Sequence, residues 1–368
     1  MVISPRIRKD LNADALFALV RKEFERISDL RNKPQGTCAD ALMAGLALFS
    51  LKDPSLLAFE DRRTDATIKS IYSIRQIPSD TNMRTILDDI DLLSLNRVFN
   101  KVLAKFQRGK GLEDMVFYDS YYLISNDGTG YFSSEKVHCA ECLIKKRSNG
   151  VIEYHHSFLG SVIIHPDKRE VIPLCPEPIK NTDGSLKNDC EQNAGKRLLA
   201  RFRREHPHMK AIIVEDALSG NAPHIQELTR HNLRFIIGIK PGSHEYLFSL
   251  LSETPTTAHE VTDESGTLHR FRFLNNVALN ECHADVRVNV IEYWETDKRG
   301  KQQHFSWITD IPITTNNVYT LMRGGRARWK IENETFNTLK NQGYQFEHNF
   351  GHGHKNLSTI FALLMMLA

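Results

Sequence analysis

Long hydrophobic runs are absent from this chain of 368 residues. The longest unbroken apolar stretch, residues 360–368, is far shorter than the roughly 18 residues that a membrane-spanning helix needs. Six cysteines scattered over a chain of this length are too few for a disulfide scaffold, so reduced thiols are expected. Residues 1–10 carry several charged side chains, which argues against a secretory signal. We therefore expect a cytoplasmic protein with no membrane partner.

A strong excess of charge of either sign is also missing. Lys and Arg number 48 and Asp and Glu number 45, which gives a formal net charge of +3, and this balance does not by itself identify a nucleic-acid partner. The first 110 residues are the basic part, with 19 Lys and Arg against 14 Asp and Glu. A composition of 41% hydrophobic and 25% charged residues is typical of a globular protein. At roughly 150 residues per domain, two or three structural units are expected.

The spacing of apolar residues divides the chain into segments. Helical spacing from about residue 13 to residue 107 predicts an all-α domain over residues 1–110, with Thr37 as the N-cap of one helix. Residues 111–241 contain short β-rich runs and two helical stretches, which predict an α/β fold with a mixed five-stranded sheet and helices on its faces. The β-rich runs lie at residues 115–118, 121–124, 161–164, 171–174, 211–214 and 235–237.

Two further segments complete the chain. Residues 242–315 interrupt the α/β pattern with β-like stretches, and we interpret them as a β-rich insertion. Helical spacing returns in residues 316–368, which we assign to the core as its C-terminal helices. Gly324 and Gly325 are expected to be a weak or kinked point there, because each Gly costs roughly 1 kcal/mol relative to Ala inside a helix.

Three acidic residues stand out by their placement. Asp127 follows an apolar strand and precedes Gly-Thr-Gly, Asp216 comes at the end of the strand 211–214, and Glu332 lies within the late helix. Ligands of open α/β sheets gather at the carboxyl ends of strands, where both aspartates are expected. Asp127 could instead only close an Asp-Gly turn, and Asp119 or Glu215 could be the ligand in place of one of these acids.

Glu332 is expected on the apolar face of its helix. At 100° per residue it shares that face with Trp329, Phe336 and Leu339, whereas Glu334 points about 160° away from it. A carboxylate on an apolar face is costly unless a positive charge compensates it. We therefore interpret Glu332 as a functional acid and Glu334 as a surface acid.

The three acids predict a metal centre. Arg328, one helical turn before Glu332, or a metal ion could compensate their charge. Carboxylates from two strand ends and a helix suit Mg²⁺ or Mn²⁺, which prefer oxygen ligands. Two such ions about 3.5 to 4 Å apart would activate an attacking hydroxyl and stabilise the leaving oxygen in phosphoryl transfer.

A second group of metal-ligating residue types contains Cys139 and Cys142. Their spacing fits the first half of a zinc site, but residues 155–156 are adjacent histidines rather than a spaced pair, and no second Cys-x2-Cys follows. Cys175 or Cys190 would have to supply a missing ligand. Zinc binding and reduced, buried thiols both remain possible at this point.

Several of these motifs resemble a known family. Residues 126–134 (NDGTGYFSS), Asp216 and residues 328–332 (RWKIE) together resemble the DDE transposases of bacterial insertion sequences, in the broad IS4-like group. Residues 77–84 (IPSDTNMR) are similar to part of the helical N-terminal region of such proteins. The resemblance covers roughly residues 80–355. In the group's signature, Tyr-x2-Arg-x3-Glu-x6-Lys, this chain has Gly325 at the Tyr position and Leu339 at the Lys position.

The resemblance implies a fold and a catalytic centre. The fold would be an RNase H-like core, and two Mg²⁺ or Mn²⁺ ions would be held by Asp127, Asp216 and Glu332. Arg328 would position phosphate or pair with an acid.

The resemblance also implies an activity. The helical domain would bind the terminal inverted repeats of double-stranded DNA, and the core would cut the element's ends and join them to target DNA, as a homodimer on the nucleoid. Two alternatives stay open. The chain stops inside the apolar run 360–368, which is compatible with a truncated transposase that binds DNA without cutting it. The core could also belong to an RNase H-like nuclease that does not transpose.

Overall fold

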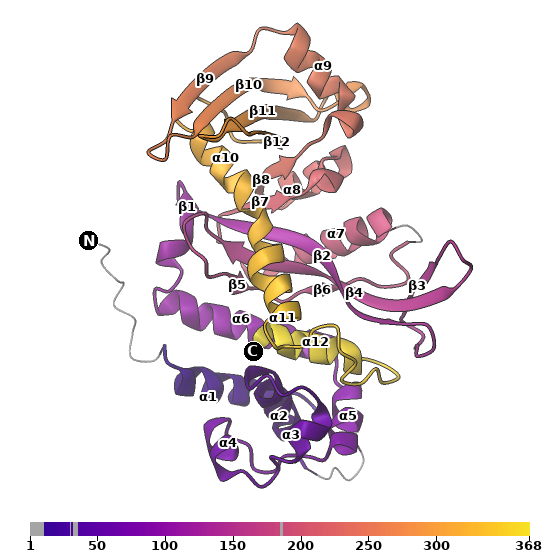
Figure 1. The fold of residues 1–368 in the computed structure, drawn as a ribbon. Helices are drawn as coiled ribbons and strands as arrows, with labels where there is room; N and C mark the ends of the chain where they lie inside the picture. Colours follow the sequence, from indigo (N-terminus) through magenta and orange to yellow (C-terminus); the bar gives the residue numbers. More distant parts are fainter. Residues whose placement is uncertain (1–10, 30, 32–35, 185–186) are drawn as a thin grey trace.

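The computed structural model describes residues 11–29, 31, 36–184 and 187–368. The predicted charged start of the chain, residues 1–10, lies outside the described residues. The described part has a helical unit at one end, a long sheet in the middle and a four-stranded extension of that sheet at the other end (Figure 1). Among the described helices, none is long and apolar enough to cross a membrane.

The helical unit is built around one buried helix. Its helices are α1 (Ala13–Phe24), α2 (Cys38–Ser50), α3 (Leu56–Glu60), α4 (Ala66–Ile71), α5 (Asp80–Asp88) and α6 (Leu92–Arg108). Thr37 caps α2 as predicted, because its side chain accepts the backbone N–H of Asp40. Every residue of α2 except Ser50 is buried, as expected of a helix that is apolar on all sides.

The apolar run near the end of the chain completes this helical unit. It forms α12 (Leu357–Leu367), which packs against α2, α5 and α6. Residues 316–368 are expected to belong to the core, and α12 does contact the sheet, because the Thr359 and Tyr131 hydroxyls are 2.8 Å apart, but it also packs against the N-terminal helices. The reason is complementary burial: α2 and α12 both have apolar residues all around, and each covers the other.

Twelve strands of the described residues form one mixed sheet, so the predicted α/β class is confirmed. They are β1 (Val116–Tyr118), β2 (Tyr121–Ser134), β3 (Leu143–Lys146), β4 (Ile152–Ile164), β5 (Ile172–Pro173), β6 (Glu177–Pro178), β7 (Ala211–Glu215), β8 (Arg234–Gly238), β9 (Thr257–Thr262), β10 (Leu268–Ala278), β11 (Arg287–Thr296) and β12 (Gln302–Thr309). The order along the sheet is β3-β4-β2-β7-β8-β12-β11-β10-β9, with β1 on β2 and with β5 and β6 on β4.

The central strands carry the α/β part of the fold. β4 is antiparallel to β2, β5 and β6, whereas β2, β7 and β8 are parallel to one another. Helix α7 (Lys187–Glu205) precedes β7, and α8 (Ala222–Arg230) connects β7 to β8. All five residues of β7 are buried, which is typical of a strand covered on both faces.

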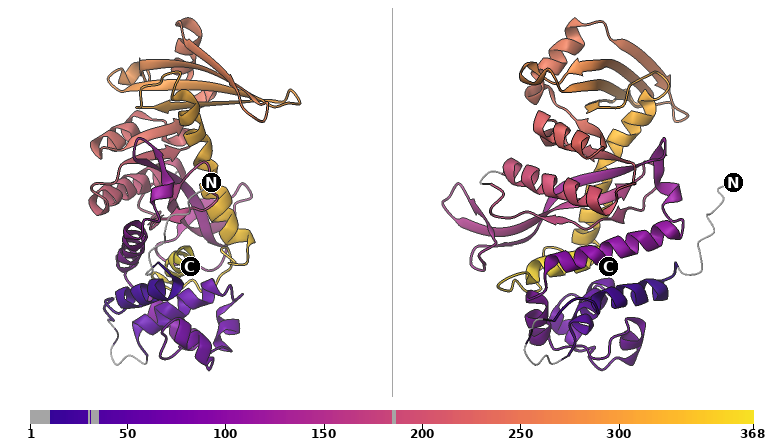
Figure 2. Two further views of the ribbon diagram at one scale, coloured as in Figure 1. Left: turned by 90° about the vertical axis from the view of Figure 1, so that its left-hand side faces the viewer. Right: turned by 180° about the vertical axis from the view of Figure 1, so that it is seen from behind.

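Residues of β7 alternate between two hydrophobic cores. Ile212 and Val214 pack in the core that contains the late helix, and Ile213 packs in the core that contains α7 and α8. This alternation is the two-residue period of a strand. Helices therefore cover both faces of the central sheet, as the two views of Figure 2 show.

The β-rich segment is continuous with the central sheet. After η3 (Pro241–Ser243) and α9 (Glu245–Glu253), strands β9 to β12 form an antiparallel meander. β12 pairs with β8, with Trp307 opposite Gly238. The Thr309 hydroxyl also donates to the Phe235 carbonyl at 2.7 Å. Residues 242–315 are thus β-rich as expected, but they extend the central sheet by an edge pairing.

The late helix crosses the sheet as a chain of different helical types. It consists of α10 (Val318–Arg326), the 3₁₀ turn η5 (Ala327–Trp329), the π-helical segment η6 (Ile331–Phe336) and α11 (Asn337–Asn341). Gly324 and Gly325 are contact points rather than the expected weak point. A Cβ at Gly325 would lie 2.5 Å from the indole nitrogen of Trp307, so the absence of a side chain lets α10 approach the sheet closely.

Asp88 connects the C-terminal segment to the helical unit. Its carboxylate accepts four backbone N–H groups at 2.8 to 3.0 Å, from His354, Lys355, Asn356 and Leu357. Burial raises the pKa of Asp88, but these four donors lower it more, so the net shift is downward.

We expect Asp88→Ala to lower the free energy of unfolding by about 2 kcal/mol, because four N–H groups lose a charged acceptor. A carboxylate with a lowered pKa stabilises the fold above its unfolded-state pKa, and this contribution is lost as the pH falls through the folded-state pKa. The difference between variant and wild type should therefore shrink below about pH 4. Urea unfolding of wild type and Asp88→Ala at several pH values measures this difference in the free energy of unfolding.

Asp89→Ala is the matched control, since Asp89 is adjacent and exposed, and its carboxylate pairs with the exposed Lys355 at 2.7 Å. Its effect should stay within about 0.5 kcal/mol. Equal losses in the two variants would contradict the role of Asp88.

Candidate active site

Asp127 and Asp216 come from adjacent parallel strands. Ser125 of β2 is opposite Val214 of β7, so Asp127 and Asp216, each two residues further on, come side by side. Asp216 directly follows β7, as predicted, and its Oδ1 accepts the backbone N–H of Leu218 at 2.9 Å. Both aspartates line one small cavity of about 40 Å³. The fold therefore brings these two predicted residues together.

Asp127 differs from its predicted position in one respect. It lies in the middle of β2 and not after a strand, because β2 continues through residues 128–130 and stays paired with β4. Gly128 faces α7 here: a Cβ at Gly128 would lie 2.5 Å from Oε1 of Glu191. The Gly-Thr-Gly sequence is thus a stretch of strand that gives room to a neighbouring helix, and not a turn.

Arg328 joins Asp127 to Glu332. Its Nη1 lies 3.2 Å from Oδ2 of Asp127 and 3.3 Å from Oε1 of Glu332. The Ser125 hydroxyl donates to the backbone carbonyl of Arg328 at 3.2 Å, which fixes η5 against β2. Asp127, Arg328 and Glu332 are therefore neighbours, and Asp216 lines a cavity together with Asp127.

The charge of this group is unbalanced. Burial and the adjacent Glu332 carboxyl raise the pKa of Asp127 and Arg328 opposes the shift, which leaves the pKa at about 7. Two carboxylates that share one arginine retain excess negative charge at this point. Oxygen donors with excess negative charge fit Mg²⁺ or Mn²⁺.

The two alternative acids have other roles. Asp119 is exposed in the turn between β1 and β2, eight residues before Asp127. Glu215 is buried, and its carboxylate accepts from Asn126 at 2.8 Å and contacts Nε2 of His224 at 2.5 Å. Burial alone raises the pKa of Glu215, but His224 and Asn126 lower it more. Glu215 therefore serves as a buried structural acid beside the site.

The predicted helix face around Glu332 was partly wrong. Phe336 and Leu339 are buried, but Trp329 is 48% exposed and stacks on Arg328, whose guanidinium carbon lies 4.5 Å from the ring centroid. The reason is the change from 3₁₀ to π-helical geometry between these residues, which invalidates a constant 100° per residue. Glu334 forms an ion pair with Arg169 at 3.2 Å, but its side chain is 27% exposed and that of Glu332 is 34% exposed, so the expected contrast between a core acid and a surface acid is wrong.

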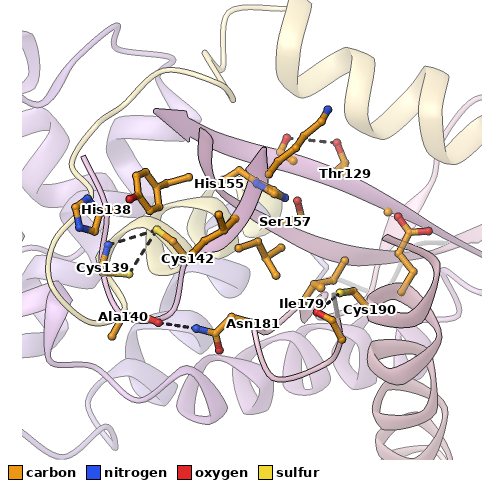
Figure 3. A pocket seen from close by; sticks show the side chains of 18 residues that line it. Thr129, His138, Cys139, Ala140, Cys142, His155, Ser157, Ile179, Asn181 and Cys190 are labelled. Carbon is orange, nitrogen blue, oxygen red and sulfur yellow. Dashed lines mark hydrogen bonds between the residues drawn. The ribbon is translucent and has the colours of Figure 1, made fainter. Parts of the chain in front are cut away.

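A larger cavity adjoins the strand that carries Asp127. It has a volume of about 870 Å³ and is lined by residues 128–130 of β2, the loop around Cys139, strand β4 and Glu191 of α7 (Figure 3). Glu191 also lines the small cavity with the two aspartates. Sequence reasoning missed Glu191, because nothing in the local pattern of α7 indicates which strand it faces.

The basic residues of α7 are largely used inside the fold. Arg197 pairs with Glu177 and Asp183, and Arg201 pairs with Glu177 at 2.6 Å. Arg203 donates to backbone carbonyls, including that of His231 at 2.7 Å. These arginines stabilise loops around the sheet, so we do not assign them a role in contacting the phosphate backbone of DNA.

Comparisons with known proteins identify no relative of this chain. No model of a known protein family matches the chain, and no curated protein matches its sequence.

Proposed function

We propose that this protein is a DDE-type DNA transposase, which cuts the ends of an insertion sequence and joins them to target DNA by metal-dependent phosphoryl transfer. The observation that carries the proposal is the meeting of Asp127 and Asp216 on adjacent parallel strands, with Glu332 bridged to Asp127 by Arg328. These are the residues that the family resemblance assigns to the catalytic centre.

The strand arrangement supports an RNase H-like core. Across the sheet, the short strands β5 and β6 lie beside β4, which is followed by β2, β7 and β8. β4 is antiparallel to β5, β6 and β2, whereas β2, β7 and β8 are parallel to one another. The resemblance implies a mixed five-stranded sheet, and this part of the twelve-stranded sheet supports that proposal. Asp216 follows the carboxyl end of β7, and Asp127 lies in β2 just beyond its parallel pairing with β7, so both are near the edge where α/β sheets bind ligands.

Each polar residue of the site has a role in this proposal. Asp127, Asp216 and Glu332 would hold two Mg²⁺ or Mn²⁺ ions, which supply an activated hydroxyl and stabilise the leaving oxygen. Arg328 is near enough to Asp127 and Glu332 to hold a phosphate oxygen of DNA beside them. The helical unit would bind terminal inverted repeats, and two copies of the chain would join the two ends.

Cleavage of a defined duplex tests the proposal. The substrate is the DNA that flanks this gene, incubated with Mg²⁺, with Mn²⁺ or with chelator. We expect metal-dependent cuts at inverted-repeat ends, and Asp216→Asn should reduce their rate at least about a hundredfold. Asn keeps an oxygen acceptor for the Leu218 N–H, so the variant separates charge from folding, which circular dichroism checks.

Other outcomes would overturn the proposal. Metal-dependent cuts without preference for the repeats would indicate an RNase H-like nuclease. If wild type and the Asp216→Asn variant both bind the repeats specifically and neither cuts them, the chain is a DNA-binding protein derived from a transposase.

A further inference from the structure

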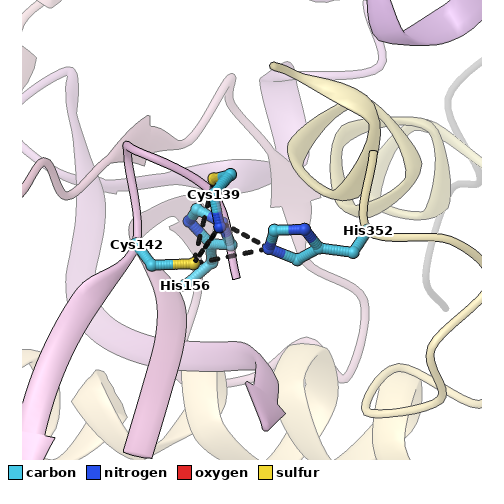
Figure 4. A group of neighbouring side chains, drawn as sticks. All are labelled: Cys139, Cys142, His156 and His352. Carbon is cyan, nitrogen blue, oxygen red and sulfur yellow. Dashed lines mark hydrogen bonds between the residues drawn. The ribbon is translucent and has the colours of Figure 1, made fainter. Parts of the chain in front are cut away.

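Four metal-ligating side chains meet at a point away from the three acids. Cys139 and Cys142 lie in the loop between β2 and β3, His156 lies in β4, and His352 lies between α11 and α12 (Figure 4). Their four ligand atoms all lie within 4.8 Å of one another. His156 and His352 are 196 residues apart in the sequence, so the tertiary fold alone brings them together.

Five of the six distances between these atoms match a tetrahedral zinc site, and the sixth, from Cys139 to His352, is within 4.8 Å. The two sulfurs are 3.8 Å apart, and the two Nε2 atoms are 3.2 Å apart. Three sulfur–nitrogen distances, from Cys139 to His156 and from Cys142 to both histidines, are 3.5, 3.4 and 3.4 Å. Zinc bonds of about 2.3 Å to sulfur and 2.0 to 2.1 Å to nitrogen give tetrahedral edges of about 3.8, 3.3 and 3.5 Å for S–S, N–N and S–N.

The surroundings orient one of the histidines as a ligand. Nδ1 of His352 lies 3.0 Å from the backbone carbonyl oxygen of Gly353. A carbonyl only accepts, so Nδ1 carries the proton and Nε2 presents its lone pair to the cluster. The ring of Phe132 packs against His352 with centroids 4.4 Å apart.

Pairwise hydrogen bonds explain the cluster less well than one central ion. Nε2 of His156 has three neighbours of the cluster within 3.5 Å, namely both sulfurs and Nε2 of His352. One ring nitrogen makes at most one such bond at a time. A single cation at the centre satisfies all four atoms together.

We propose that Cys139, Cys142, His156 and His352 bind one structural Zn²⁺. Four protein ligands leave no open position for a substrate, which is the arrangement of structural rather than catalytic zinc. Cys142, His156 and His352 are buried and Cys139 is half-buried, which limits exchange with solvent.

The ion would join distant parts of the chain. β2 and β4 form the antiparallel pair that carries Asp127, and His352 belongs to the segment that links the late helix to α12. Two residues beyond His352, the same segment is held by Asp88 of the helical unit. Zinc would therefore fix the C-terminal segment to the sheet on one side, while Asp88 fixes it to the helices on the other. This role does not depend on the proposed activity.

Metal analysis of the full chain tests the proposal. We expect about one zinc per chain after purification without added metal. X-ray absorption at the zinc edge should give two sulfur neighbours at about 2.3 Å and two nitrogen neighbours at about 2.0 Å. Co²⁺ added to the chelated protein should give the visible absorption of a tetrahedral site with thiolate ligands.

Matched variants assign the ligands. Cys142→Ser and His352→Gln should lose zinc and the cobalt absorption, whereas Cys282→Ser and His354→Gln should keep both. Full folding of wild type with no bound zinc or cobalt would overturn the proposal, and so would a zinc edge with other neighbours. The absorption measurements use wild type, so they decide the matter even if a variant does not fold.

Discussion

Glu332→Gln should reduce metal-dependent cleavage by at least about a hundredfold, while Glu334→Gln should stay within about twofold of wild type. Glu332 lies 3.3 Å from Arg328 and shares it with Asp127. Glu334 is in the same π-helical segment but forms an ion pair with Arg169 outside the site. The two substitutions make the same chemical change in the same helix, so a difference between them reports position relative to the metal centre.

The measurement is the single-turnover cleavage rate of the duplex with terminal repeats, at increasing Mg²⁺ concentration. If Glu332 is a metal ligand, the variant should need more Mg²⁺ to reach half of its maximal rate. Equal losses in the two variants would show that the helix tolerates no change there. Equal activity of both with wild type would remove Glu332 from the catalytic centre.

Local patterns predicted the parts of the fold that depend on local forces. The run 211–214 was predicted as a doubly covered strand, and β7 is buried on both faces. Asp216 was placed at the end of that strand, where it lies. Thr37 was predicted to cap a helix, and it caps α2. Capping and burial periodicity depend on neighbouring residues, so one sequence is enough to predict them.

Other features depend on partners far away in the sequence. Asp127 was expected after a strand because an apolar run precedes it, but pairing with β4 extends β2 beyond it. The orientation around Glu332 was misjudged because a π-helix has no signature in the residue spacing. The cysteine pair was noticed, but its partners are His156 and His352 rather than Cys175 or Cys190. The tertiary fold brings these distant residues together, and no local sequence pattern indicates which residues will meet.

Gly325→Tyr should prevent stable folding, although it restores the tyrosine of the family signature. A Cβ at this position would lie 2.5 to 2.9 Å from three atoms of the Trp307 indole. Trp307 is 5% exposed and stacks on Phe305, with ring centroids 5.9 Å apart, so it has little room to move. The departure from the signature is therefore a packing requirement between α10 and β12.

Gly325→Ala is the milder form of the same test. Helix propensity alone would favour Ala by about 1 kcal/mol, but overpacking costs typically 1 to 3 kcal/mol and here involves a rigid ring. We expect a net loss of about 1 to 2 kcal/mol in the free energy of unfolding, measured by urea denaturation. Gly242→Ala is the control, since a Cβ there would meet no atom within 4 Å.

A double-mutant cycle then identifies the ring that causes the loss. Trp307→Leu removes the atoms that oppose the new Cβ, so Gly325→Ala should cost at least about 1 kcal/mol less in that background than in wild type. An unchanged cost would mean that the helix backbone, and not the contact with Trp307, requires glycine. The outcome also decides whether a tyrosine could act in phosphate positioning here, because a position where a methyl group already clashes with Trp307 has no room for a phenol.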